Sequence, residues 1–371
     1  MSVKVKIEEL LQEMVEREAS DLFLKAGQRP CLRIDGQIVM TDHPELTMDE
    51  SHEIAVQLMT PEQAEYFRTV PEMDLAVGIR GVGRFRVNVF RQRGSTGLVF
   101  RYVSNPSFSF EELNLPPVVR DLSNRRRGLI LVTGTTGSGK STTLAAMINH
   151  INHTRRAHIV TIEDPIEFLH QDDLAIISQR EVGFDTKSFS DALKHVLRQS
   201  PDIILIGEMR DLETISTAIA SAETGHLVLS TLHTIDAVQT VERVINYFPA
   251  YLHPQIRMEL ALCLEGAICQ RLLPMASGRG RIPAVEILIG TSSVRKLLHE
   301  GRTLELPQYI EAGGHVGMQT FNQSLLALYR AKKIKMEDAL AFATSPDEFR
   351  LMADGIASGV RAKEMGGHYS R

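Results

Sequence analysis

Cysteine is scarce in this chain, since Cys31, Cys263 and Cys269 are the only three among 371 residues. No two of them are spaced as CxxC, which excludes a four-cysteine zinc site and makes a disulfide framework unexpected. Such low cysteine usage is typical of a reducing compartment. We therefore expect all three to be small, buried apolar residues.

Long hydrophobic runs are missing as well. No stretch approaches the roughly 18 consecutive apolar residues that are needed to cross a bilayer. Residues 1–20 form an acidic, amphipathic pattern without the apolar centre of a signal peptide. We expect a cytoplasmic protein that reaches the inner face of the membrane only through partners.

An excess of basic residues is absent too, because the formal net charge is -5. This balance argues against general binding of nucleic acid, and none is expected as a partner. The hydrophobic fraction of 43% is ample for buried cores, and the length suggests two or three domains.

The first 100 residues have the pattern of a small α+β domain. Apolar residues at helical spacing predict a helix over residues 4–18, and a second helical stretch runs from about Met48 to Phe67. Short strand-like runs, among them DLFLKAG, CLRIDGQIVM, EMDLAVGI and TGLVFRYV, surround these helices. In the run GRFRVNVF, apolar and polar residues alternate, which indicates one buried and one polar face.

The pattern changes after this domain. The stretch VSNPSFSFEELNLPPVV carries three prolines and several polar residues, and residues 101–115 are the best candidate for a linker. From residue 116 onwards, apolar runs alternate with helical segments, the runs being GLILVTG, HIVTIED, DIILIGE, HLVLSTL and AVEILIG. Unbroken apolar runs separated by helices predict an α/β domain whose mostly parallel sheet is covered on both faces. The chain is mostly helical from about Val294, and we expect residues 353–371 to form a mobile tail.

The segment GTTGSGKS, from Gly134 to Ser141, carries the sharpest functional signal. It satisfies the pattern GxxxxGK[ST] between an apolar run and a helical pattern, so a chance glycine-rich turn is the weaker alternative. Glycines let backbone N–H groups surround phosphate oxygens, and the following helix points its positive end at the same anion. Lys140 is expected to bridge the terminal phosphates and Ser141 to bind Mg²⁺. The predicted nucleotide-binding residues are Gly134, Thr135, Thr136, Gly137, Ser138, Gly139, Lys140, Ser141 and Thr142.

Two acidic segments are candidates for the chemistry of hydrolysis. Glu208 follows the apolar run DIILIG and could act on Mg²⁺ directly or through water. Glu163 follows the run HIVTI and is accompanied by Asp164 and Glu167. Hydrolysis needs a group that orients water near the γ-phosphate, and the residues alone do not choose between Glu163 and Glu208.

Two histidines, His226 and His233, flank the apolar run LVLSTL. Histidine can supply the hydrogen-bond donor that senses a γ-phosphate. The residues alone favour a structural role for each.

Four segments follow one another in a fixed order, namely GTTGSGKS, TIEDPIE, DIILIGEMRDLET and TGHLVLSTLHT. Together they resemble the Walker A, Asp box, Walker B and His box of the type II/IV secretion ATPase superfamily, and most closely its PilT/PilU family of pilus retraction ATPases. The resemblance covers nearly the whole chain and includes SDLFLKAGQRPCLRIDG and GMQTFNQSL. A long N-terminal region and a four-cysteine metal element, which many assembly ATPases carry, are both absent, and this favours retraction.

This resemblance implies a hexameric motor whose subunits contain a PAS-like N-terminal domain followed by a RecA-like ATPase domain. ATP and Mg²⁺ are the implied cofactors, and the implied work is pilus retraction in twitching motility. The implied partners are the other subunits of a homohexamer, an inner-membrane platform protein of the pilus machine and a paralogous retraction ATPase.

The resemblance also implies roles for single residues. Glu163 is implied to activate the attacking water, and Glu208 to support the metal. His226 and His233 are implied to couple the nucleotide state to the subunit interface. Arginines of the first domain are implied to reach the phosphates, and a plain surface position is the alternative for each candidate. These candidates are Arg84, Arg86 and Arg101.

One departure from the family pattern leaves the place of the chain in the pilus machine open. Retraction enzymes carry an AIRNLIRE-like segment, whereas residues 293–300 here are SVRKLLHE. The predicted function is a motor that powers pilus retraction, with an accessory PilU-like or assembly-type ATPase as the alternative, and the sequence does not choose between a principal motor and an accessory paralogue.

Other functional classes fit the sequence less well. A GTPase should have an NKxD motif that recognises the base, and this sequence has none. A small-molecule kinase would not need the first domain. A nucleotide-gated scaffold with little turnover is disfavoured because all the acidic catalytic candidates are present. A DNA translocase is disfavoured by the acidic charge and by the lack of an aromatic and basic stripe.

Overall fold

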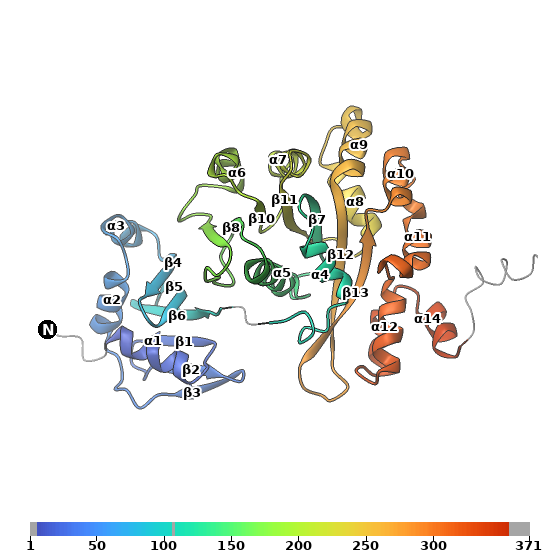
Figure 1. The fold of residues 1–371 in the computed structure, drawn as a ribbon. Helices are drawn as coiled ribbons and strands as arrows, with labels where there is room; N and C mark the ends of the chain where they lie inside the picture. The colour runs from blue at the N-terminus through green and yellow to red at the C-terminus, as the bar shows by residue number, and fades with distance from the viewer. Residues whose placement is uncertain (1–5, 106–107, 356–371) are drawn as a thin grey trace, which may run out of the picture. The chain divides into compact units, whose positions relative to one another are not determined.

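The computed structural model describes residues 6–105 and 108–355 (Figure 1). These residues form two compact units, one of residues 6–105 with Glu167–Leu169, the other of residues 108–166 with 170–355. The predicted tail beyond residue 355 and the first residues of the helix predicted over 4–18 lie outside the described part.

The first unit is built on a six-stranded antiparallel sheet in the order β3-β2-β1-β6-β5-β4. Three helices accompany this sheet, which gives the small α+β domain expected from the sequence. The strands are β1 (Asp21–Lys25), β2 (Cys31–Ile34), β3 (Gln37–Met40), β4 (Glu72–Ile79), β5 (Gly83–Gln92) and β6 (Ser95–Val103). The helices are α1 (Ile7–Glu16), α2 (Met48–Gln57) and α3 (Pro61–Thr69).

Alternation in β5 separates a buried face of this sheet from a polar one. Phe85, Val87 and Val89 are at most 1% exposed and share one hydrophobic cluster with Leu10 of α1 and Ile54 of α2. Because side chains alternate along a strand, the arginines between these residues lie on the opposite face. The prediction from the run GRFRVNVF is confirmed.

The stretch predicted as helical from Met48 to Phe67 is mostly helical, but it is divided into two helices, α2 and α3. Thr60 caps the second helix with its side chain, which accepts a hydrogen bond from the backbone of Gln63, and Pro61 occupies the first turn. Proline is well suited to a first turn but removes a hydrogen bond and clashes inside a helix. The chain therefore begins a new helix at this point.

The second unit contains a seven-stranded sheet in the order β13-β12-β7-β11-β10-β8-β9. All neighbours are parallel except β12 and β13, so the predicted mostly parallel sheet is confirmed. The strands are β7 (Gly128–Thr133), β8 (His158–Glu163), β9 (Ile176–Glu181), β10 (Ile203–Ile206), β11 (Leu227–Leu232), β12 (Leu264–Pro274) and β13 (Arg281–Ile289).

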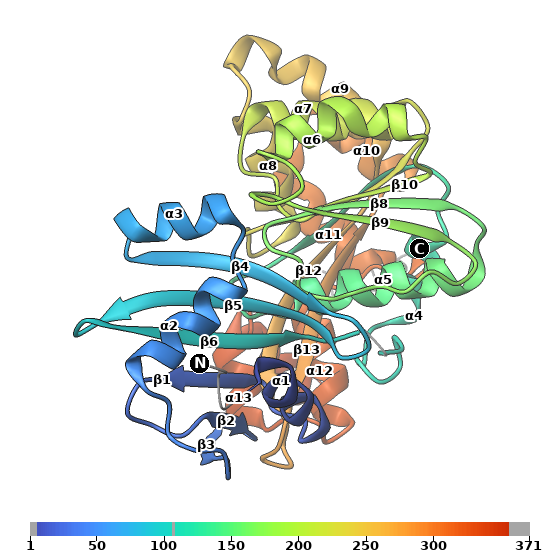
Figure 2. The same ribbon diagram turned by 90° about the vertical axis from the view of Figure 1, so that its left-hand side faces the viewer.

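Helices cover both faces of this sheet. Figure 2 shows α5 (Lys140–Thr154) on one side of the parallel strands, and α6 (Phe189–Val196) with α7 (Leu212–Glu223) on the other. The other helices are α4 (Pro117–Ser123), α8 (Ala237–Asn246), α9 (His253–Cys263), α10 (Ser292–Glu300), α11 (Leu306–Ala312), α12 (Phe321–Arg330), α13 (Met336–Phe342) and α14 (Pro346–Ala353). The helical character predicted from about Val294 onwards is confirmed.

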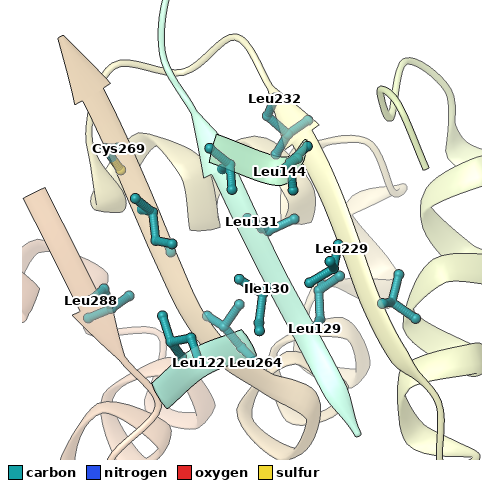
Figure 3. Packing of buried hydrophobic residues seen from close by; sticks show 14 of the residues in the cluster. Leu122, Leu129, Ile130, Leu131, Leu144, Leu229, Leu232, Leu264, Cys269 and Leu288 are labelled. Carbon is teal, nitrogen blue, oxygen red and sulfur yellow. The ribbon is translucent and has the colours of Figure 1, made fainter. Parts of the chain in front are cut away.

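The core of the second unit is centred on β7, which lies between β11 and β12 (Figure 3). Every residue of β7 is buried, and Ile130 and Leu131 pack in one cluster with Leu229 and Leu264 of the flanking strands. A strand buried on both faces needs an unbroken apolar sequence, which the run GLILV supplies. This burial fixes the position from which the glycine-rich loop leaves the sheet.

Four details of the prediction need correction. The run AVEILIG forms β13, which pairs antiparallel with β12 in a hairpin and is not a further parallel strand. Neither β9 nor β12 was predicted. Residues 101–103 of the predicted linker belong to β6, while Phe110 and Leu115 pack into the core of the second unit. Residue 353, which we placed in the tail, still belongs to α14.

Candidate active site

The glycine-rich loop connects the end of β7 at Thr133 to the start of α5 at Lys140. Gly134, Gly137 and Gly139 adopt φ angles of 144°, 78° and 91°, a region that side chains other than glycine rarely tolerate. A Cβ atom at Gly134 would lie 2.5 Å from both the backbone oxygen of Gln270 and Oγ of Ser138. The loop conformation therefore requires a glycine at its first position.

The start of α5 offers donors to an anion. Its N-cap residue, Gly139, has no side chain that could satisfy the free N–H groups of the first turn. Lys140 lies at the same end and is only 9% exposed, with Nζ donating to the carbonyl oxygens of Gly134 (2.8 Å) and Thr135 (3.0 Å). The positive end of the helix and the ammonium group thus converge on the loop, which is the arrangement that binds phosphate.

Two buried polar atoms beside the loop have no hydrogen-bond partner among the described residues. They are Oγ of Ser138 and Oε1 of Gln270. The amide nitrogen of Gln270 donates to Oγ1 of Thr143 at 2.9 Å, so this side chain is held in place from α5. Buried polar groups are normally paired, and a phosphate with its bound water would supply partners for both atoms. The loop therefore fits a phosphate-bearing ligand.

A pocket of about 380 Å³ adjoins the outer side of the loop. Thr135, Thr136 and Gly137 form one wall, and Leu272 and Phe342 contribute apolar surface to another. A mixture of apolar walls and a few polar groups is typical of a pocket for a small organic ligand.

The strand order brings the acidic candidates to the same edge of the sheet as the loop. Moving away from β7, the neighbours are β11, β10 and β8, and the residues that follow their carboxyl ends are His233 and Glu208, with Glu163 as the last residue of β8. A Cβ atom at Gly207 would lie 3.3 Å from Cα of Glu163. The Walker B segment and the Asp box are therefore in direct backbone contact.

Glu163 is held by hydrogen bonds at the end of β8. Its Oε1 accepts from Oγ1 of Thr161 at 2.7 Å and from Nε2 of Gln179 at 3.2 Å. Gln179 belongs to β9, the edge strand beside β8. These two hydrogen bonds restrict the rotation of the carboxylate.

Glu208 is held by two basic side chains. Its Oε2 lies 2.8 Å from Nη2 of Arg210, and its Oε1 lies 3.2 Å from Nε2 of His233. Burial acts to raise the pKa of Glu208, but the hydrogen bond from Arg210 and the charges of His233 and Arg210 outweigh it, and the pKa is lowered. Arg210 also reaches Asp164, with 3.9 Å between Nη1 and Oδ2, so it links the Walker B segment to the Asp box.

The two histidines lie at opposite ends of β11. His233 follows the strand at the loop edge, whereas His226 precedes it and accepts the backbone N–H of Gly128 on its carbonyl oxygen at 3.0 Å. At about 3.3 Å per residue, a six-residue strand separates them by about 20 Å. The structure does not bring His226 to the site of its own chain, and the interface role that the resemblance implies for it stays a prediction.

The three candidate arginines share one face of the sheet in the first unit. Arg86 of β5 lies directly opposite Arg101 of β6, and Arg84 is two residues before Arg86. Arg101 is engaged within the unit, because its Nε lies 2.9 Å from Oδ1 of Asp21, a carboxylate that also pairs with Arg33 at 3.2 Å. Arg101 therefore helps to hold Asp21 within the first unit, and the role that the resemblance implies for each of the three arginines stays a prediction.

Three residues of the site were not predicted from the sequence. Arg210 could have been found, because a basic residue two positions after the Walker B glutamate is within reach of it. Gln179 and Gln270 had no local signal, since each is placed by a strand that the apolar pattern did not reveal.

Neither a preformed metal cluster nor a membrane-spanning helix occurs in residues 6–105 and 108–355. No three His, Cys, Asp or Glu side chains there are arranged to hold a metal ion. No helix of that part is both long and apolar enough to span a bilayer.

Known proteins with similar sequences include two pilus ATPases. The type IV pilus ATPase PilU of Pseudomonas aeruginosa is 43% identical over 348 residues, which cover 94% of this chain and 91% of PilU. The type IV pilus retraction ATPase PilT of the same organism is 44% identical over 343 residues, which cover 92% of this chain and 99% of PilT.

Solved structures of ATPases are similar to this chain in fold. The crystal structure of the pilus retraction motor PilT with bound ADP has a TM-score of 0.84 and 46% identity, covering 93% of this chain and 99% of that one. The ATPase DotB of Legionella pneumophila has a TM-score of 0.76 and 25% identity, with 95% of this chain covered and 96% of DotB. The family model of the Type II/IV secretion system protein matches residues 1–333. The chain therefore belongs to the type II/IV secretion system protein family, and its second unit is a RecA-like ATPase domain of that family.

Proposed function

We propose that this chain is an ATP-hydrolysing motor that powers type IV pilus retraction and twitching motility. The observation that carries the proposal is the meeting of a complete phosphate loop with Glu163 and Glu208 at one edge of a parallel sheet. Its relatives support it, because they include a pilus retraction ATPase and a twitching motility protein of Neisseria gonorrhoeae that is 43% identical.

ATP would bind with its triphosphate in the loop. Lys140 would leave the loop carbonyls and donate to the terminal phosphates, while Ser138 and the first N–H groups of α5 donate to the phosphate oxygens. The adjoining pocket of about 380 Å³ would take the base and sugar. A bound ADP in the solved PilT structure supports this assignment.

Ser141 and Glu208 are the residues that would hold Mg²⁺, Glu208 through water, and the ion would neutralise charge on the phosphates. Glu208 suits this role because Arg210 and His233 keep its pKa low, so it stays ionised. A carboxylate that is already ionised can orient metal-bound water without first losing a proton.

Glu163 would orient the water that attacks the γ-phosphate. Thr161 and Gln179 both donate to one of its oxygens, so the rotation of the carboxylate is restricted. A group that positions water and accepts its proton contributes typically about 10²- to 10⁴-fold to a rate. Arg210 lies close to both acidic segments and would keep Glu208 and the Asp box in register.

Motion would arise between subunits of a homohexamer. Arg84 and Arg86 on the polar face of the first unit would stabilise charge on the phosphates. Loss of the γ-phosphate removes the charge that holds such contacts closed. The work would pass to an inner-membrane platform protein, with a paralogous retraction ATPase as a further partner, and the protein would act at the cytoplasmic face of that membrane.

A second candidate function is that of an accessory, PilU-like ATPase. It is favoured by one observation, namely that the identities to PilU and PilT, 43% and 44%, are nearly equal. The segment SVRKLLHE, which forms α10 with its preceding serine, departs from the pattern of retraction enzymes.

The enzymatic part of the proposal is tested by ATP hydrolysis of the purified full chain in the presence of Mg²⁺. We expect Lys140→Ala to lower the rate by about 10²-fold or more, since it removes a charge-stabilising donor. Lys296→Ala is the matched control, because this lysine is 71% exposed on α10. A wild-type protein that does not hydrolyse ATP, or a Lys140→Ala variant with the wild-type rate, would contradict the proposal.

The biological part is tested by replacing the gene with the Lys140→Ala allele and imaging pili. Hyperpiliated cells that do not twitch are the expected result for the principal retraction motor. Cells without pili would indicate assembly instead, and normally piliated cells with retraction of reduced force would indicate an accessory ATPase.

A further inference from the structure

A second pocket lies at the edge of the RecA-like sheet that faces away from the phosphate loop. Its volume is about 530 Å³, and its lining comes from the segments that precede four parallel strands, β7, β8, β10 and β11. The lining residues are Arg126, Arg155, Arg156, Pro201, Asp202, Thr224, Gly225 and His226. Since the strands run from this edge to the loop, the two sites are about 20 Å apart.

Three guanidinium groups converge on this pocket. Arg126 belongs to the run of arginines before β7, and Arg155 and Arg156 follow α5. Arg126 and Arg156 are exposed, and neither makes a hydrogen bond or ion pair with any residue of the described ranges. Arg155 is half-buried and is fixed by a bond from Nη1 to the backbone oxygen of Arg125 at 3.0 Å.

The positive charge of the pocket is poorly compensated. Among the described lining residues Asp202 is the one carboxylate, and its Oδ2 already accepts the backbone N–H of His158 at 2.8 Å. Burial lowers the pKa of Arg155, Asp202 partly offsets this effect, and the charge of Arg126 adds to it. The guanidinium groups therefore repel one another and would gain from a bound anion.

His226 supplies a fourth nitrogen to the same pocket. Its Nδ1 lies 3.0 Å from the carbonyl oxygen of Ser221 and so carries the proton in that hydrogen bond. This bond fixes the ring and leaves Nε2 for another partner. The adjacent Gly225 has a φ of 114°, and nothing lies within 4 Å of the position of its absent Cβ, so a ligand can approach the backbone.

We propose that this pocket binds a phosphate group through Arg126, Arg155, Arg156 and His226. Guanidinium groups bind phosphate oxygens in pairs of parallel hydrogen bonds, which makes arginine better suited than lysine to such a site. Concave shape and convergence from separate loops distinguish this site from arginines scattered on a surface. The phosphate could belong to a small soluble molecule or to the headgroup of an anionic lipid, and both share the chemistry of the site.

The test uses the full chain with Lys140→Ala, so that the phosphate loop contributes little to binding. Pyrophosphate is titrated calorimetrically into this protein and into the same protein with Arg126→Ala and Arg156→Ala. We expect the two substitutions to weaken binding by about tenfold for each charge-assisted bond that is lost. The matched control carries Arg29→Ala and Arg127→Ala, which remove the same charge from exposed positions that do not line the pocket.

Sedimentation with vesicles distinguishes the two sources of phosphate. Vesicles of phosphatidylglycerol and phosphatidylcholine are compared with vesicles of phosphatidylcholine alone. Binding to the anionic vesicles that is lost with Arg126→Ala and Arg156→Ala, and kept in the control, identifies a lipid headgroup, whereas pyrophosphate binding alone identifies a soluble ligand.

Three outcomes would overturn the proposal. The first is a protein that binds neither probe, and the second is equal binding by the pocket variant and its control. The third is a pocket variant that keeps full affinity for pyrophosphate but has a changed oligomeric mass, because the arginines would then serve a contact between copies of the chain. None of these outcomes depends on ATP turnover, so the proposed motor function is tested separately.

Discussion

His233 and Glu208 join two neighbouring strands at the edge that carries the phosphate loop, with 3.2 Å between Nε2 and Oε1. Arg210 binds the other oxygen of the same carboxylate at 2.8 Å. The Walker B carboxylate is therefore clamped from both sides. This clamp fixes the direction in which Glu208 presents its charge, and it links the His box to the acidic centre.

Replacement of His233 by alanine is expected to lower kcat of ATP hydrolysis by about tenfold, the usual effect of losing one charge-assisted hydrogen bond. The affinity for nucleotide should change little, because His233 does not line the loop pocket. Steady-state kinetics with ATP would separate the two effects. The control is His299→Ala, an exposed histidine on α10, and an unchanged kcat for His233→Ala would show that the clamp has no role in turnover.

Replacement of Arg210 by alanine should shift the acidic limb of the pH–rate profile. Arg210 helps to keep the pKa of Glu208 below its ordinary value, whereas burial acts to raise it. Without Arg210 the pKa rises, so protonation of Glu208 begins at higher pH and the rate falls earlier as pH is lowered. Rates measured between pH 4.5 and 8 would reveal the shift. A shift of one pKa unit corresponds to a free-energy difference of about 1.4 kcal/mol.

Arg198→Ala is the control for this experiment, since Arg198 is exposed and lies outside the site. If the rate fell by the same factor at every pH and the acidic limb did not move, Arg210 would affect the geometry of the site and not the pKa of Glu208.

Glu163→Gln should abolish most turnover and preserve nucleotide binding. Glutamine keeps the size of the side chain and can still meet Gln179, but it cannot accept a proton from water. We expect hydrolysis to fall by about 10²- to 10⁴-fold. Fluorescent nucleotide binding would measure affinity, and Glu167→Gln, an exposed position nearby, is the matched control. Turnover retained by Glu163→Gln would transfer the role of water activation to another residue.

His170 makes the stability of the chain sensitive to acid. Burial lowers its pKa from 6.5 to about 4, and its Nδ1 has no partner among the described residues. Between these pKa values the unfolded state binds the proton that the folded state resists, so stability falls as pH decreases from 7 to 5. The loss attributable to this group is about 1–2 kcal/mol.

Thermal unfolding at pH 7 and pH 5 would measure the effect of His170. The fall in Tm between the two pH values should be smaller for His170→Gln than for the wild type, whereas His315→Gln, which changes an exposed histidine, should keep the full fall. Equal falls in all three proteins would show that His170 is protonated in the folded state.

Arg101 is expected to stabilise the first unit more than it assists catalysis. Asp21 is 4% exposed, and Arg101→Ala would leave this buried carboxylate with Arg33 and Ser20 as its remaining partners. A hydrogen bond to a charged group contributes about 1.5–3 kcal/mol, and we expect a value at the low end because Arg101 is itself 67% exposed. Urea unfolding would report the loss.

Arg86→Ala serves as the comparison, since Arg86 lies on the same face and directly opposite Arg101. We expect Arg86→Ala to reduce turnover more than Arg101→Ala does. The reverse order would identify Arg101 as the arginine that reaches the phosphates.

Much of the fold could be predicted because its signals are local. The phosphate loop is a contiguous segment in which Gly134 must adopt a positive φ and Lys140 must begin a helix, so the spacing of a few residues is sufficient. The apolar run of β7 is equally clear, since a strand buried on both faces has no polar positions. The break between α2 and α3 was missed although Thr60 and Pro61 signal it, because the apolar pattern continues across them.

The remaining features depend on contacts between distant segments. β9 has one buried residue among six and reads as a surface segment, yet it carries Gln179 to Glu163. The antiparallel direction of β13 follows from its hairpin with β12. The apolar run AVEILIG alone does not show this direction, because it looks the same in a parallel strand.

The sequence by itself determined the chemistry available to this protein, namely a phosphate loop, two acidic segments and two histidines. Only the tertiary structure decided how these groups are shared between two edges of one sheet. Strand order places β11 beside β10, which brings His233 to Glu208, while His226 precedes β11 and lies in a basic pocket at the opposite edge, about 20 Å away. The order of the strands depends on how complete faces of the sheet and helices pack in the core. It therefore cannot be predicted from any short segment of the sequence.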